Sequence, residues 1–188
     1  MSGRRITVLY EDQLAARPNN YGPHVLMLAC VADRMGGDTW MLGKRVLAIA
    51  KKGDSKLRAA LREEGAMLAD GGPVVAMFDA DRVRACYGLP SNACKQSVLD
   101  AIEAEASGVP VIVLLERNME DVVAACCAAS NKPFPQSKPT PQQRDAILHG
   151  AASAGAAVRV QVLASVPSFE RLVRAVHGLL EIADASKP

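Results

Sequence analysis

Short apolar runs alternate with longer amphipathic stretches along most of the chain. Five of the short runs predict buried strands: 6–10, 46–50, 74–78, 111–115 and 158–163. Apolar residues recur at helical spacing in the longer stretches, which predicts these helices: 23–35, 57–69, 91–107, 119–129, 141–154 and 169–183. Such alternation is typical of an α/β fold, here a mainly parallel central sheet flanked by helices on both faces.

Proline marks the main boundary in the chain. Four prolines fall between 131 and 143, which predicts a Pro-rich surface loop or linker that acts as a lid, a docking loop or only a connection. With 188 residues, one domain is favoured. We therefore expect an α/β core over 1–130, the loop at 131–143, and a helix–strand–helix unit over 144–188 that completes the same domain. Loops are also expected at 15–22 and, as a loop or short helix, at 81–89.

Composition narrows the possibilities. Hydrophobic residues make up 49% of the chain but aromatic residues only 4%, so the core must consist of Ala, Val and Leu. A net charge of +2 means that any basic surface is local. No apolar run reaches the ~18 residues of a membrane span, and the apolar stretch near the N-terminus is too short for a signal peptide. We expect no membrane association and a cytoplasmic protein.

Cysteine spacing gives little support for a metal centre. The five cysteines contain no Cys-x-x-Cys pair, and only Cys86 and Cys94 are spaced so that they could approach one ion. No second pair accompanies them, which disfavours zinc. Reduced thiols are the expectation for a cytoplasmic protein.

Acidic residues follow three of the predicted strands. Glu11 follows the first, Asp79 and Asp81 the third, and Glu116 the fourth. In a parallel sheet the carboxyl ends of all strands lie at one edge, so these side chains can converge there. Carboxylate oxygens are hard ligands that suit Mg²⁺ or Mn²⁺. The alternative is that Asp79 caps the next helix and Asp81 is only solvated.

A basic segment follows the second predicted strand, at the same edge. Its polar and charged residues are Lys51, Lys52, Gly53, Ser55 and Lys56. Gly53 permits a tight turn, and the N–H groups of the helix beyond it can bind a phosphate. Metal-binding carboxylates beside phosphate-binding lysines are what phosphodiester chemistry requires. The alternative is that the lysines are ordinary solvated charges.

The order of these motifs resembles the Toprim domain of topoisomerases, primases and small or OLD-type nucleases. The matching residues are Glu11 at the end of the first strand, Gly53 and Ser55 after the second, and Asp79 and Asp81 after the third. The likeness covers about residues 4 to 125. The segment from Leu114 to Asp121 resembles the OLD-type continuation.

The resemblance implies a role for each residue. Glu11 would be the acid/base or a metal ligand, Asp79 and Asp81 would bind Mg²⁺, and Glu116 or Glu120 would hold a second metal ion. Contacts to phosphate would come from Lys51, Lys52 or Lys56.

Two features depart from the family pattern. Asp12 stands where the family usually has Gly, which removes a close backbone approach to phosphate and supplies a possible extra ligand. Arg82 and Arg84 follow the Asp-x-Asp pair where Gly is common, and we expect them to bind the substrate backbone.

These observations favour a Mg²⁺- or Mn²⁺-dependent nuclease that cuts DNA or RNA. By analogy with the family alone, an ATPase partner in an anti-phage defence system is expected. The apolar stripe over 169–183 fits either core or the surface of a homo-oligomer. Two other functions stay open: a non-catalytic module that binds a partner or nucleic acid, and a phosphatase with Asp79 as nucleophile, although that class has its Asp-x-Asp on the first strand. P-loop, Gly-x-Ser-x-Gly and Gly-x-Gly-x-x-Gly motifs do not occur.

Overall fold

The structure is a computed structural model, and it describes residues 5–11, 21–108, 110–116 and 118–186. Asp12 and most of the loop expected at 15–22 therefore lie outside the described residues. In the part that is described, no helix has the length and apolar character needed to cross a membrane.

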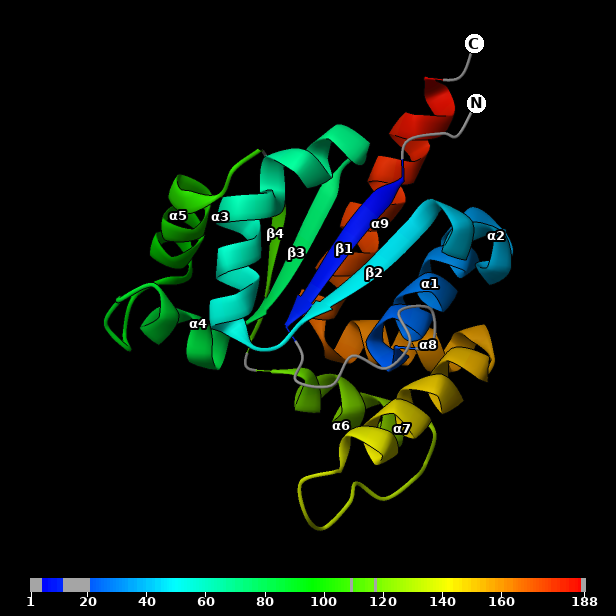
Figure 1. Cartoon of the computed structure of the whole chain (residues 1–188). Helices are drawn as coiled ribbons and strands as arrows, with labels where there is room; N and C mark the ends of the chain where they lie inside the picture. Colours follow the sequence, from blue (N-terminus) through cyan, green and yellow to red (C-terminus); the bar gives the residue numbers. More distant parts are fainter. Residues whose placement is uncertain (1–4, 12–20, 109, 117, 187–188) are drawn as a thin grey trace.

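The described residues form a parallel sheet of four strands, as the apolar runs predict (Figure 1). The strands are β1 (Ile6–Glu11), β2 (Val46–Lys51), β3 (Val74–Asp79) and β4 (Val111–Leu115). Their order is β2-β1-β3-β4, so the chain moves outward from β1 to β2 and then crosses back to β3 and β4. The strand order reverses between β1 and β3, and open α/β sheets bind their ligands beside the carboxyl ends of the strands at such a point.

Helices cover both faces of the sheet, which confirms the predicted α/β architecture (Figure 1). One face packs against three helices: α3 (Asp54–Gly71), α4 (Ala80–Cys86) and α5 (Lys95–Glu105). The other packs against α9 (Pro167–Ala185), and four more helices extend that layer: α1 (Gly22–Met35), α6 (Met119–Ala129), α7 (Pro141–Ser153) and α8 (Ala156–Ser165). Alternate strand residues supply the two cores, for example Tyr10 and Met77 to one and Leu9 and Phe78 to the other.

The strand predicted at 158–163 is wrong, because this segment lies within the helix α8. Val158, Val160 and Val162 alternate like strand residues, but Val160 is 62% exposed. Val158 is partly buried against the core and Val162 is buried four residues later, which is the spacing of a helix face. The described residues from 144 to 186 therefore form a series of three helices rather than the predicted helix–strand–helix unit.

Other element boundaries differ less. The short helix α2 (Thr39–Arg45) was not predicted; the Asp38 side chain caps it by accepting a hydrogen bond from the Trp40 N–H at 2.8 Å. The segment expected to be a loop or short helix at 81–89 contains α4, and the remaining predicted helices occur with shifted ends.

The apolar stripe on α9 belongs to the core of the chain itself. Leu172, Val173, Val176 and Leu180 are each at most 1% exposed. Full burial of such a side chain stabilises a fold by about 1.5–3 kcal/mol. Of the two interpretations of this stripe, core packing is the one that holds.

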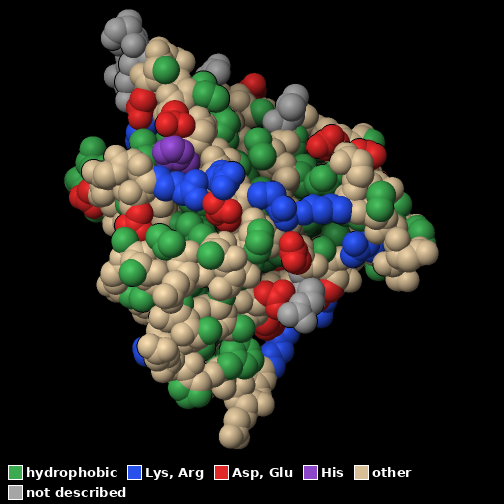
Figure 2. All heavy atoms as spheres, turned by 180° about the vertical axis from the view of Figure 1, so that it is seen from behind, with side chains coloured by type: hydrophobic (Ala, Val, Ile, Leu, Met, Phe, Trp, Pro, Cys, Tyr) green, Lys and Arg blue, Asp and Glu red, His purple; other side chains and the backbone are tan. Residues whose placement is uncertain are grey.

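Basic side chains are unevenly distributed although the net charge is only +2. Seen from behind, the molecule carries a band of Lys and Arg side chains across its middle, interrupted by acidic groups (Figure 2). The face on which the band lies is the one covered by α9 (Figure 1).

Candidate functional site

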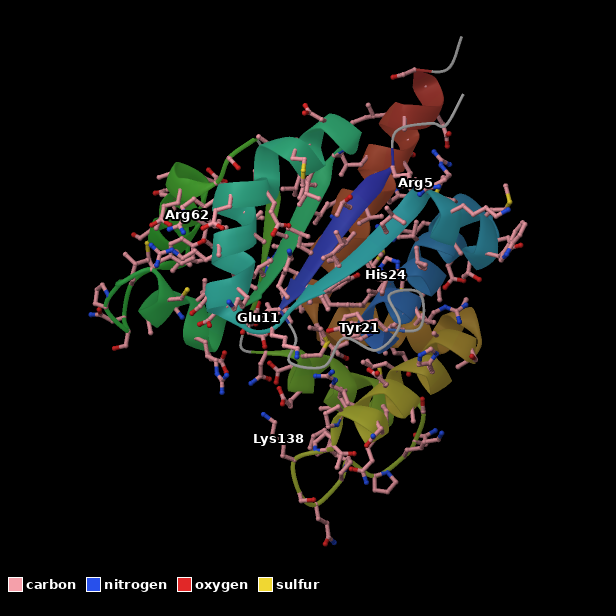
Figure 3. All side chains as sticks on the ribbon, in the orientation of Figure 1. Arg5, Glu11, Tyr21, His24, Arg62 and Lys138 are labelled. Atoms are coloured by element: carbon pink, nitrogen blue, oxygen red, sulfur yellow. The ribbon has the colours of Figure 1, made fainter. Side chains whose placement is uncertain are left out.

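Glu11 and Asp79 lie side by side where the strand order reverses. Glu11 is the last residue of β1 and Asp79 the last residue of β3, the strand next to it. The Asp79 backbone N–H donates a hydrogen bond to Glu11 Oε2 at 3.2 Å, which fixes the Glu11 carboxylate at the end of the sheet. Figure 3 shows Glu11 at this end of the sheet and Lys138 on the Pro-rich loop below it.

A cleft of about 460 Å³ opens at this point. Four carboxylates line it, from β1, β3, α4 and α6: Glu11, Asp79, Asp81 and Glu120. Three cationic side chains also line it: Arg82, Lys138 and Arg144. The cleft thus combines the oxygen donors that a divalent cation prefers with positive groups that suit a phosphate.

The environment of Glu11 disfavours its charged form. Burial raises the pKa of the Glu11 carboxyl above its ordinary value, and the charges of Asp54 and Asp81 raise it further. The hydrogen bond from Asp79 and the charge of Arg82 act in the opposite direction. A carboxyl held in this way is suited to exchange a proton or to accept a cation as its counter-charge.

Asn118 organises one wall of the cleft. Its side-chain amide donates to Asp81 Oδ2 at 3.1 Å, and its side-chain oxygen accepts from the Glu120 N–H at 3.1 Å. Asn118 therefore caps the N-terminus of α6 and orients the Asp81 carboxylate at the same time.

The Pro-rich segment covers the cleft. Lys138, Pro139 and Pro141 line the cavity, and Pro139 is buried. Lys138 Nζ lies 2.8 Å from Glu120 Oε1, and its side chain extends from the loop toward the end of the sheet that carries Glu11 (Figure 3). The Pro-rich segment therefore forms one wall of the cleft.

The basic segment after β2 contributes less to the cleft than the sequence suggests. Gly53 lines it, with φ of +86° that permits the tight turn, but Lys52, Ser55 and Lys56 are not among its lining residues. Lys51 Nζ instead pairs with Glu64 at 2.8 Å. The Asp54 side chain accepts from the Ser55 N–H at 2.8 Å, which puts a carboxylate where a phosphate was expected.

Glu116 and Arg84 lie outside the cleft. Both line a smaller cavity of about 210 Å³ near the end of β4. The Arg84 guanidinium donates to the Ala80 and Ala93 carbonyls at 2.7 and 3.0 Å, so it braces the start of α4 against the turn before α5.

The four cleft carboxylates offer the oxygen donors that a divalent cation such as Mg²⁺ prefers. Within the described residues, however, no three Asp, Glu, His or Cys side chains are close enough together to hold one ion. The structure therefore places the donors around one cleft without gathering them at one point.

Sequence reasoning missed three residues of the site: Asn118, Lys138 and Arg144. Asn118 carries a sequence signal, since an Asn followed by two acids and an apolar run is typical of a helix N-terminus. Lys138 and Arg144 have no such signal, because only the path of the Pro-rich loop brings them to the cleft.

Comparison of the chain with models of known protein families matches none of them, and its comparison with curated proteins yields no significant match.

Proposed function

We propose that the protein is a divalent-metal-dependent nuclease of Toprim type that hydrolyses phosphodiester bonds of DNA or RNA. The observation that carries the proposal is the cleft beside β1 and β3, where Glu11, Asp79, Asp81 and Glu120 lie among Arg82, Lys138 and Arg144. The order of the sequence motifs supports the same family. A cytoplasmic location and an ATPase partner belong to the proposal by analogy.

Asp79 and Asp81 would hold Mg²⁺ or Mn²⁺ with water molecules as the remaining ligands, and Glu11 and Glu120 would face the ion across the cleft. The ion would supply an activated water and neutralise charge on the phosphoryl oxygens. Glu11, with its raised pKa, takes up a proton at its free carboxylate oxygen, while Oε2 stays hydrogen-bonded to the Asp79 N–H. Arg82 and Arg144 would bind the phosphate oxygens, and Lys138, which now pairs with Glu120, would join them when the substrate is bound.

Cleavage of plasmid, single-stranded DNA and tRNA with Mg²⁺ or Mn²⁺ tests the activity. Glu11→Gln and Asp79→Asn are each expected to lower the rate by roughly 100-fold or more. Asp70→Asn is the matched control, because Asp70 lies on the surface near the end of α3, before β3 begins. Equal rates in all variants, or a wild type that cuts none of the substrates, would contradict the proposal.

Metal binding has a readout of its own. An ion that binds only the folded chain stabilises it by about 2.7 kcal/mol at a concentration 100 times its Kd, so Mg²⁺ is expected to raise Tm. Asp79→Asn is expected to abolish the rise and Asp70→Asn to keep it. NaCl at equal ionic strength is the solvent control.

A second candidate function is a non-catalytic module that binds nucleic acid or a partner. The observation that favours it is that, among the described residues, no three ligands are gathered around one point. Binding of nucleic acid without cleavage, and without any effect of Mg²⁺ on Tm, would support this function.

A further inference from the structure

The second cavity, beside β4, brings together basic residues from three helices. Its 210 Å³ are lined by Arg84 of α4 and Lys95 of α5, and Arg171 of α9 acts on Lys95 through its charge. Lys95 and Arg171 are both exposed. In the described part of the chain, neither of them belongs to an ion pair.

Positive charge is in excess in this group. Partial burial lowers the pKa of the Lys95 ammonium and the neighbouring Arg171 lowers it further, while Glu116 acts in the opposite direction. Two cations, Arg84 and Lys95, thus line the cavity with one carboxylate, Glu116, and Arg171 adds a third positive charge beside Lys95. Elsewhere on the same face the charges are paired: Glu170 accepts from Arg34 at 3.1 Å and from Arg174 at 2.9 Å.

The cavity is a neighbour of the catalytic cleft. The helix α4 separates them, with Asp81 lining the cleft and Arg84 lining the cavity. Asp81 and Arg84 lie three residues apart on this helix, so the two openings are close neighbours along α4. The connection between β4 and α6 also contributes to both: Glu116 lines the cavity and Asn118 lines the cleft.

We propose that Lys95 and Arg171, braced by Arg84, bind a non-scissile backbone phosphate of a nucleic-acid strand whose scissile phosphate lies in the cleft. The inference rests on the proposed function for its substrate class. It assigns to the strand a path from the cleft over α4 to the cavity beside β4. Since these side chains touch phosphate alone, the site adds affinity without sequence preference.

Fluorescence anisotropy of labelled single-stranded DNA and RNA, measured in EDTA and again in Ca²⁺, tests the site separately from cleavage. The double variant Lys95→Ala/Arg171→Ala is expected to bind roughly tenfold more weakly, with the slope of log K against log salt reduced by about 0.7. Arg174→Ala is the matched control: it lies one turn beyond Arg171 on α9, but its charge is already paired with Glu170.

Glu116→Gln gives a test of opposite sign. Removal of the one carboxylate of the cavity is expected to strengthen binding several-fold, whereas a metal ligand at this position would make the same change abolish cleavage. In cleavage assays the double variant is expected to show a higher KM and a nearly unchanged kcat. This is the result when the lost contact stabilises the bound substrate and the transition state equally.

Two results would overturn the inference. One is a double variant that binds as Arg174→Ala does, with an unchanged salt slope. The other is a wild type that binds neither strand. If the double variant loses binding but the wild type never cleaves, the phosphate site is supported and the nuclease activity is contradicted.

Discussion

A buried histidine in the core makes the stability of the fold depend on pH. His24, near the start of α1, is 1% exposed, and its Nδ1 lies 3.0 Å from the hydroxyl of Tyr10, the neighbour of Glu11 in β1 (Figure 3). Burial lowers the pKa of His24 to about 4, although a hydrogen bond with the Val46 backbone raises it in part. The imidazole is therefore neutral in the folded protein at physiological pH.

The sign and size of the effect follow from linkage. In the unfolded chain His24 binds a proton below its ordinary pKa of 6.5, whereas the folded chain does so only near 4. Stability is therefore intact above about pH 7 and is lost as the pH falls through this window. At about 1.4 kcal/mol per pKa unit the full loss is about 3 kcal/mol, of which about 2 kcal/mol occurs between about pH 7.5 and pH 5.

Urea unfolding followed by circular dichroism at these two pH values measures the effect. Other groups also titrate, so the quantity of interest is the difference between wild type and His24→Gln. The variant is expected to lose about 2 kcal/mol less than the wild type. His177→Gln, on α9 beside Glu181, is the control for replacing a histidine outside the buried core.

An equal loss of stability in His24→Gln and the wild type would refute this reasoning. Should the variant not fold, NMR titration of the His24 ring in the wild type decides the question. A midpoint near 6.5 would show that the ring is solvated rather than buried.

Three further predictions concern the cleft. Glu11→Gln is expected to raise the free energy of unfolding at pH 7, because the raised pKa of Glu11 means that its ionised form destabilises the fold. This gain should vanish at acid pH, where Glu11 is protonated. Chemical denaturation at several pH values measures it. Gly53→Ala is expected to cost roughly 2 kcal/mol through backbone strain alone, since φ is +86° and no atom lies within 4 Å of an added Cβ; a Tm unchanged from wild type would contradict this. Lys138→Ala is expected to change stability by less than about 1 kcal/mol, because its pair with Glu120 is solvent-exposed, but to raise KM for cleavage.

The periodicity of the sequence determined most of the architecture. Four apolar runs became the four described strands because strands buried on both faces need continuous apolar side chains, whatever their neighbours are. Glu11 and Asp79 could be placed at one edge on the same basis, since parallel strands share the direction of their carboxyl ends. The prediction of a strand at 158–163 was wrong because its valines are compatible with both a helix and a strand. Which of the two forms depends on the surface against which they pack.

The rest of the site was decided by the tertiary structure. The position of β3 next to β1 depends on the crossover of α3, which no local pattern specifies, and it creates the hydrogen bond between Asp79 and Glu11. The path of the Pro-rich loop brings Lys138 over the cleft, while the pairing of Lys51 with Glu64 turns that lysine away from it. Sequence spacing determines which side chains reach the edge of the sheet, but packing over long sequence separations determines which of them meet.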